Sequence, residues 1–262
     1  MTLTDFHTHT RFSDGADTAE AMVRQALEKG LRKIGISDHC YTFFDESYCI
    51  PKDTVDSYKK EIAALKEKYR GKIDVLCGIE QDMFSGADTA GFDYVLGSAH
   101  YLQCGETYLP VDESPAIFES IATEHFGGDY LALTEAYYQT VAQVVARTDC
   151  NIIAHFDLVT RFNAGERYFS ERAPRYVAAY RQALHVLLDC NKPFEINTKL
   201  LARGLKEEPY PRYDICDYIA ANGGSFILGS DAHNASEIAF GFEALKSIAE
   251  KRGWKIHDEF MD

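Results

Sequence analysis

The chain has 262 residues, 46% of them hydrophobic and 26% charged, which excludes a disordered or fibrous protein. Its 41 acidic and 27 basic residues give a formal net charge of −14, so its surface repels long nucleic acids and anionic lipids. No apolar run approaches the roughly 20 residues of a membrane span, and the N-terminus lacks the features of a signal peptide.

Short β-rich, mostly apolar runs alternate with helical patterns along the whole chain. Buried strands are predicted at residues 3–6, 33–37, 73–79, 94–98, 151–154, 193–196 and 225–228. Helices are predicted at about residues 18–29, 53–69, 115–126, 130–147, 173–190, 213–222 and 236–251. Asp17 is placed to cap the first helix and Gly30 to end it. Because no linker interrupts these seven βα units, we expect one domain over residues 1–262 with a parallel sheet covered by helices.

Cysteine usage bears on the compartment. The seven cysteines, which include no CxxC pair, are Cys40, Cys49, Cys77, Cys104, Cys150, Cys190 and Cys216. Their odd number and scatter predict free thiols in a reducing cytoplasm rather than a disulfide framework or a zinc knuckle.

Six of the nine histidines stand at or just past the ends of predicted strands: His7, His9, His39, His100, His155 and His233. Glu80 and Asp231 hold equivalent positions, and Asp14 lies in the first loop. Functional sites of parallel α/β folds form at the carboxyl ends of the strands. Imidazole and carboxylate are ligands of Zn²⁺, Mn²⁺ and Fe²⁺, so nine such groups on one rim predict two or three ions. His125, His185 and His257 are assigned to structural or surface positions.

Six short motifs occur in order: residues 5–9 (DFHTH), 13–15 (SDG), 37–39 (SDH), 78–80 (GIE), 97–100 (GSAH) and 229–233 (GSDAH). This ordered set resembles the polymerase and histidinol phosphatase (PHP) superfamily. The resemblance implies a distorted, TIM-like (β/α)7 barrel with three divalent metal ions at the C-terminal ends of its strands. It assigns His7, His9, Glu80 and Asp231 to the first metal, Glu80, His100 and His155 to the second, and Asp14, His39 and His233 to the third.

Further segments resemble the histidinol-phosphatase branch: residues 111–114 (VDES), 155–162 (HFDLVTRF), 195–198 (EINT) and 208–211 (EPYP). The resemblance implies that Arg161 contacts a substrate phosphate, with Arg203 as the candidate for a second such arginine. Residues 199–202 (KLLA) depart from the small residues expected there. The implied activity is hydrolysis of L-histidinol phosphate to L-histidinol and phosphate in histidine biosynthesis.

Charge arithmetic suggests how such a site would work. Three divalent ions, three carboxylates and one bridging hydroxide leave a net charge of about +2. This local positive charge would attract a phosphate dianion although the protein as a whole is acidic. Our hypothesis is that the bridging hydroxide attacks phosphorus while the third metal and Arg161 neutralise the phosphoryl oxygens.

Weaker expectations concern the neighbours of the predicted ligands. Asp5, Asp38 and Asp157 could orient an imidazole, or could equally be capping or solvent-exposed residues. Cys40 could be an additional soft ligand or a simply buried thiol.

Two other functions are compatible with the sequence. One keeps the metals but acts on small nucleotides, as a phosphodiesterase, exonuclease or general phosphatase. The other is a non-catalytic structural module, which the nine filled ligand positions disfavour. The metal predicted from the sequence is Zn, Mn or Fe. The oligomeric state has no signature in the sequence.

Overall fold

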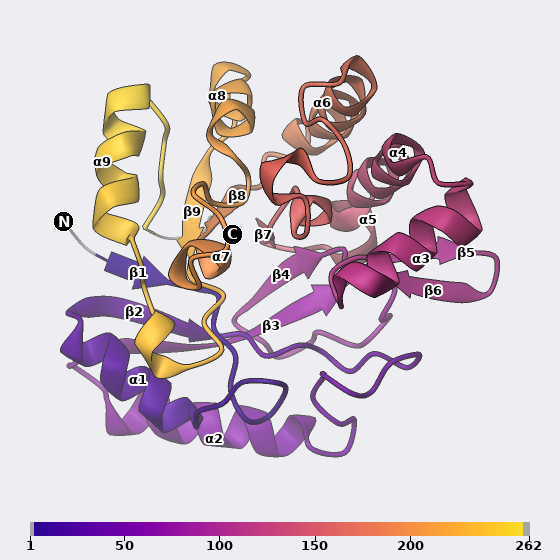
Figure 1. Cartoon of the computed structure of the whole chain (residues 1–262). Helices are drawn as coiled ribbons and strands as arrows, with labels where there is room; N and C mark the ends of the chain where they lie inside the picture. Colours follow the sequence, from indigo (N-terminus) through magenta and orange to yellow (C-terminus); the bar gives the residue numbers. More distant parts are fainter. Residues whose placement is uncertain (1–2, 259–262) are drawn as a thin grey trace.

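The structure is a computed structural model that describes residues 3–258. Seven strands form one sheet: β1 (Leu3–Asp5), β2 (Leu31–Ile36), β3 (Asp74–Asp82), β4 (Tyr94–Ser98), β7 (Ile152–Ile153), β8 (Phe194–Asn197) and β9 (Phe226–Gly229). Their order is β1-β2-β3-β4-β7-β8-β9, and each neighbouring pair is parallel. A parallel bridge from Thr8 to Ala232 joins the two edges, so the sheet is a nearly closed barrel (Figure 1).

Helices surround the barrel (Figure 1). They are α1 (Ala19–Glu28), α2 (Val55–Lys68), α3 (Pro115–Phe126), α4 (Tyr130–Val141), α5 (Val144–Thr148), α6 (Pro174–Leu188), α7 (Lys199–Ala202), α8 (Tyr213–Ala221) and α9 (Phe242–Arg252). Three short 3₁₀ turns occur at η1 (Leu158–Thr160), η2 (Ala164–Glu166) and η3 (Ala235–Glu237). The alternation of strands and helices confirms the predicted (β/α)7 architecture.

Several predicted boundaries are wrong. The helix predicted over residues 130–147 is divided into α4 and α5, and the last helix begins at Phe242 instead of residue 236. Thr18 caps α1, because its side chain accepts from the Ala21 N–H, whereas Asp17 accepts from the Ala235 N–H across the fold. The sequence analysis also missed α7 and the antiparallel hairpin of β5 (Tyr101–Cys104) and β6 (Thr107–Pro110).

One aromatic ring helps to fill the inside of the barrel. Tyr94 belongs to a small buried cluster with Phe6, and its hydroxyl donates to the Phe6 carbonyl at 2.5 Å. A β-carbon at Gly35 or Gly78 would lie 1.9 or 2.2 Å from atoms of the Tyr94 side chain. These two glycines therefore leave the space that the ring needs. The larger apolar cluster lies between the sheet and the helices.

Asp5 links the two edge strands of the barrel, β1 and β9. Its buried carboxylate accepts from the backbone N–H groups of His7 at 3.3 Å, Ser230 at 3.0 Å and Ala239 at 2.9 Å. The hypothesis that Asp5 orients an imidazole is therefore wrong. It holds the ends of the two edge strands together, immediately below the residues that were predicted to bind metal.

None of the helices within residues 3–258 combines the length and the apolar character that a membrane crossing requires. The seven cysteines are free thiols, as the sequence predicted, and four of them are buried.

Candidate metal centre

The nine predicted ligands converge on one end of the barrel. His7 and His9 follow β1, His39 follows β2, and Glu80 lies near the end of β3. The remaining strand ends supply His100 after β4, His155 after β7, and Asp231 and His233 after β9, while Asp14 comes from the loop before α1. Because all the strands are parallel, their carboxyl ends share one rim, and side chains from distant parts of the chain meet there.

Glu80 occupies the middle of this cluster and is 1% exposed. Its Oε2 lies 3.1 Å from His7 Nε2 and 3.0 Å from His39 Nδ1. Its Oε1 lies 2.8 Å from His155 Nε2 and 3.3 Å from His100 Nε2. Burial raises the pKa of Glu80, but the surrounding imidazoles more than offset this and hold that pKa well below its usual range. One carboxylate thus has an oxygen directed to each side of the cluster, as a bridging ligand requires.

The possible ligand atoms fall into overlapping sets. In each of four groups they lie within 4.8 Å of one another: His9, Asp14, His39 and His233; His7, Glu80 and His155; His7, His9 and Asp231; His39, Glu80 and His100. All nine predicted residues are included. The groups differ from the three expected sets, because His9 also joins Asp14 and His233, and His39 also joins Glu80. The division of ligands among individual ions therefore stays a prediction.

The cluster has the chemistry of a site for transition-metal ions. Among the described residues, both ring nitrogens of His9 and the Nδ1 of His155 are buried without a hydrogen-bond partner. Burial, reinforced by the His39 and His233 rings, lowers the pKa of His9 well below its usual value, which favours the neutral ring that binds metal. Leaving buried nitrogens unsatisfied is unfavourable, and a divalent ion in the cluster would satisfy His9 Nε2, which lies 3.2 Å from Asp231 Oδ1. The nitrogen and carboxylate donors fit Zn²⁺, Mn²⁺ or Fe²⁺.

Glu195 orients the buried ring of His7, and the sequence analysis gave it no such role. Its Oε1 lies 2.6 Å from His7 Nδ1, and its Oε2 accepts from the backbone N–H of His155 at 2.9 Å. A carboxylate behind the ring selects the tautomer that presents Nε2 to the cluster. The available signal was a glutamate between two apolar residues of β8, Phe194 and Ile196.

Asp82 similarly lies behind His100, with Oδ2 3.4 Å from Nδ1. The two other aspartates suggested for this role do not orient imidazoles. Asp38 accepts from the Thr10 N–H and hydroxyl and from the Ser13 hydroxyl, so it organises the loop that carries Asp14. The side chain of Asp157 accepts from the backbone N–H of Arg212 at 3.3 Å.

Gly229→Ala tests the support that Glu195 provides. A β-carbon at Gly229 would lie 1.9 Å from Glu195 Oε1, so the methyl group displaces the carboxylate from His7. We expect a loss of about 1–3 kcal/mol in the free energy of unfolding from overpacking, and a 10- to 100-fold loss of metal affinity or activity. Chemical denaturation and metal analysis measure the two effects. Wild-type values for both would contradict this role of Glu195.

Arg161 and Arg203, the two arginines predicted to bind phosphate, line a cavity of about 400 Å³ next to the cluster. Its wall includes Arg161 and Arg203 together with Asp14, His39, His100 and His233. Arg161 Nη1 lies 3.4 Å from Asp112 Oδ2, and Arg203 Nε lies 3.2 Å from Glu237 Oε1. The two guanidinium groups therefore border the same space as the exposed side of the metal-ligating groups.

The other candidates lie outside the cluster. Cys40 donates to the Ser85 hydroxyl at 3.2 Å, burial raises its pKa to about 12, and it belongs to none of the four ligand groups. His125 lies in the last turn of α3, His185 is exposed on α6, and His257 is near the end of the described chain. None of the three belongs to a ligand group, as predicted.

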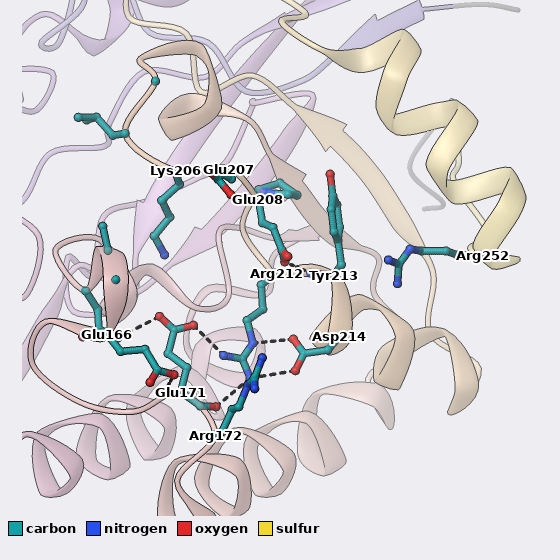
Figure 2. Close-up of a pocket in the computed structure, with 16 residues that line it drawn as sticks. Glu166, Glu171, Arg172, Lys206, Glu207, Glu208, Arg212, Tyr213, Asp214 and Arg252 are labelled. Carbon is teal, nitrogen blue, oxygen red and sulfur yellow. Dashed lines mark hydrogen bonds and ion pairs between the residues drawn. The ribbon is translucent and has the colours of Figure 1, made fainter.

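A second cavity, of about 730 Å³, contains no predicted site residue. Figure 2 shows that Arg212 in its lining pairs with two neighbouring carboxylates. Arg212 Nη1 lies 2.7 Å from Glu171 Oε2, and its Nη2 lies 2.9 Å from Asp214 Oδ2. The smaller cavity therefore remains the candidate active site, since only it opens onto the histidine and carboxylate cluster.

Comparison with known proteins agrees with this geometry. The family model of the PHP domain matches residues 5–199. A curated protein of Deinococcus radiodurans named "Probable histidinol-phosphatase" is 29% identical and aligns over 96% of this chain and 94% of its own length. Two crystal structures share the fold at lower identity. The hisK structure from Listeria monocytogenes has a TM-score of 0.79 and 21% identity, covering 92% of this chain and 99% of its own.

The second is histidinol phosphate phosphatase from Lactococcus lactis, complexed with zinc, L-histidinol and phosphate. It has a TM-score of 0.71 and 22% identity, covering 99% of this chain and 98% of its own. The family match, the barrel and the cluster at its carboxyl rim lead to one conclusion: this chain belongs to the PHP family.

Proposed function

We propose that this chain is a metal-dependent phosphomonoesterase that hydrolyses L-histidinol phosphate to L-histidinol and phosphate in histidine biosynthesis. The observation that carries the proposal is the convergence of nine nitrogen and carboxylate donors beneath a cavity bordered by Arg161 and Arg203. The name of the Deinococcus relative and the ligands of the Lactococcus enzyme support this substrate. We infer a single PHP-type domain over residues 1–262, acting in the cytoplasm, where free thiols persist.

We propose three divalent ions, of zinc, manganese or iron, as cofactors held by His7, His9, Asp14, His39, Glu80, His100, His155, Asp231 and His233. When bound, such ions polarise phosphoryl oxygens and make hydroxide available from water near neutral pH. Glu195 and Asp82 hold the rings of His7 and His100 in the orientation that presents Nε2.

The rest of the cavity suits a small substrate that carries both a phosphate and an amine. Arg161 and Arg203 would bind the phosphate, because the paired N–H donors of a guanidinium group match the spacing of phosphate oxygens. Tyr101, Asp112 and Glu113 also line the cavity, and we propose that they face the remainder of the substrate. The acidic surface of the protein disfavours long nucleic acids, so a small molecule is the proposed partner.

Arg161→Ala is expected to lower kcat/KM for a phosphomonoester by about 10- to 100-fold, because hydrogen bonds to a charged group are worth about 1.5–3 kcal/mol. We expect KM to rise and kcat to fall, since contacts to the dianion strengthen toward the transition state. Steady-state kinetics measure both. Arg161→Lys keeps the charge but lacks the paired N–H donors of the guanidinium group. Its kcat/KM should lie between that of the wild type and that of Arg161→Ala. Wild-type kinetics for Arg161→Ala would remove it from the site.

A phosphate-release screen of the metal-loaded protein tests the proposed function. The substrates are L-histidinol phosphate, a nucleoside bisphosphate and a phosphodiester, each at matched concentration. We expect the highest kcat/KM for L-histidinol phosphate. Preference for the diester or the bisphosphate would assign the protein to nucleotide chemistry, and no turnover of any substrate would favour a structural module.

A further inference from the structure

A lysine side chain reaches into the predicted metal cluster. Lys199 is the first residue of α7, and its backbone N–H donates to Asn197 Oδ1 at 3.0 Å. Its Nζ lies 3.0 Å from Asp231 Oδ1 and 3.3 Å from His233 Nε2. The side chain is only 12% exposed and borders the 400 Å³ cavity. Neither the metal cluster nor the arginine pair accounts for this cation.

Lys199 uses the same atoms that a metal ion would use. His233 Nδ1 lies 3.0 Å from the Asp231 carbonyl, which can only accept, so this nitrogen carries a hydrogen. His233 Nε2 also lies 3.1 Å from Asp14 Oδ2, and in a neutral ring protonated at Nδ1 this nitrogen has a single lone pair, directed at the cluster. That lone pair can bind either an ammonium hydrogen or a metal ion. When the cluster holds metal, Lys199 therefore loses His233 and competes for Asp231 Oδ1.

The cavity offers the displaced ammonium a new partner. Arg161 and Arg203 border the same cavity, and each is already paired with a carboxylate, Asp112 and Glu237 respectively. Lysine differs from them because its compact charge sits on a flexible four-carbon stem that can turn without moving the backbone. A phosphate dianion bound in this cavity would offer a Lys199 ammonium that has left the cluster an anionic partner.

We propose that Lys199 Nζ binds the phosphate group of the substrate in the metal-loaded protein, as a third cation beside Arg161 and Arg203. The proposal rests on the proposed phosphomonoesterase function. It makes Lys199 a residue with two alternating partners, the carboxylate of Asp231 without metal and the phosphate with metal. Removing its charge should therefore change metal binding and phosphate binding in opposite directions.

Lys199→Met tests this directly, because methionine retains an unbranched stem without the ammonium. Calorimetric titration of the zinc-loaded protein with inorganic phosphate should show a dissociation constant about tenfold higher or more than for the wild type. Titration with a chelator should show zinc retained to a higher chelator concentration, because the competing cation is gone. Lys199→Arg should restore most of the phosphate affinity.

Lys59→Met is the matched control. Lys59 lies on α2, and its Nζ donates to the Ala90 carbonyl at 2.6 Å, away from the cavity. We expect wild-type values in both titrations. Circular dichroism of each variant checks that the barrel is folded.

Three outcomes would overturn the role of Lys199. They are unchanged phosphate affinity in folded Lys199→Met, no phosphate binding by the zinc-loaded wild type, and a gain of one bound zinc ion with phosphate affinity unchanged. The last would mean that Lys199 replaces a metal ion. The proposed function fails separately, if the wild type binds phosphate but releases none from L-histidinol phosphate.

Discussion

Glu80→Gln is expected to lower phosphate release from L-histidinol phosphate by about 10³-fold or more. The carboxylate lies within 3.4 Å of a ring nitrogen of His7, His9, His39, His100 and His155, so no other side chain of the described cluster contacts as many of its histidines. Glutamine keeps the volume but removes the charge and one acceptor oxygen. A bound metal supplies several kcal/mol of transition-state stabilisation, and each 1.36 kcal/mol is a factor of ten in rate.

Steady-state phosphate release and metal analysis of the purified variant measure this effect together. Glu61→Gln, on the exposed part of α2, makes the same chemical change away from the site and should behave as the wild type. A Glu80→Gln protein that keeps full metal content and turnover would show that Glu80 is not a ligand. Unfolding of the variant is excluded by its circular dichroism spectrum.

Removing the metal ions with a chelator is expected to abolish phosphate release and to lower the thermal midpoint by about 5–10 °C. Ligand at 100 times its dissociation constant stabilises the folded state by about 2.7 kcal/mol. In a protein of this size, about 1 kcal/mol corresponds to roughly 2–4 °C in Tm. The physical cause is the packing of three carboxylates among six imidazoles, most of them buried, which the cations hold together.

Differential scanning calorimetry before and after chelation measures the change in Tm, and adding back zinc, manganese or iron identifies the ions that restore activity. Glu80→Gln provides the internal comparison, because its Tm should respond less to the chelator. Full turnover after complete metal removal would contradict a metal-dependent reaction.

Local sequence patterns predicted most of the groups that converge on the rim, because each of these depends on a single strand. An apolar run followed by histidine or a carboxylate indicates both the strand and the end at which the polar group appears, as for His39 after β2 and His100 after β4. The parallel arrangement then requires these ends to meet. The family resemblance added Arg161 and assigned Asp14, already noted in the first loop, to the third metal; neither loop carries such a periodic pattern.

Contacts across the barrel could not be predicted in the same way. Glu195 lies behind His7 although 188 residues separate them, and Lys199 reaches Asp231 from the adjoining strand end. Asp5, Asp38 and Asp157 stand beside ligand histidines in the sequence yet bond to other groups. Proximity along the chain therefore misidentified the groups that orient the imidazoles.

By itself, the sequence determined the seven strands of the barrel, the rim on which the polar groups gather and the kind of ligand they offer. The tertiary structure alone decided which groups face one another, because closure between β1 and β9 and the register of each strand set distances across the barrel. Gly229 illustrates the difference: its lack of a side chain makes room for the Glu195 carboxylate, a requirement that exists only once β8 and β9 are paired.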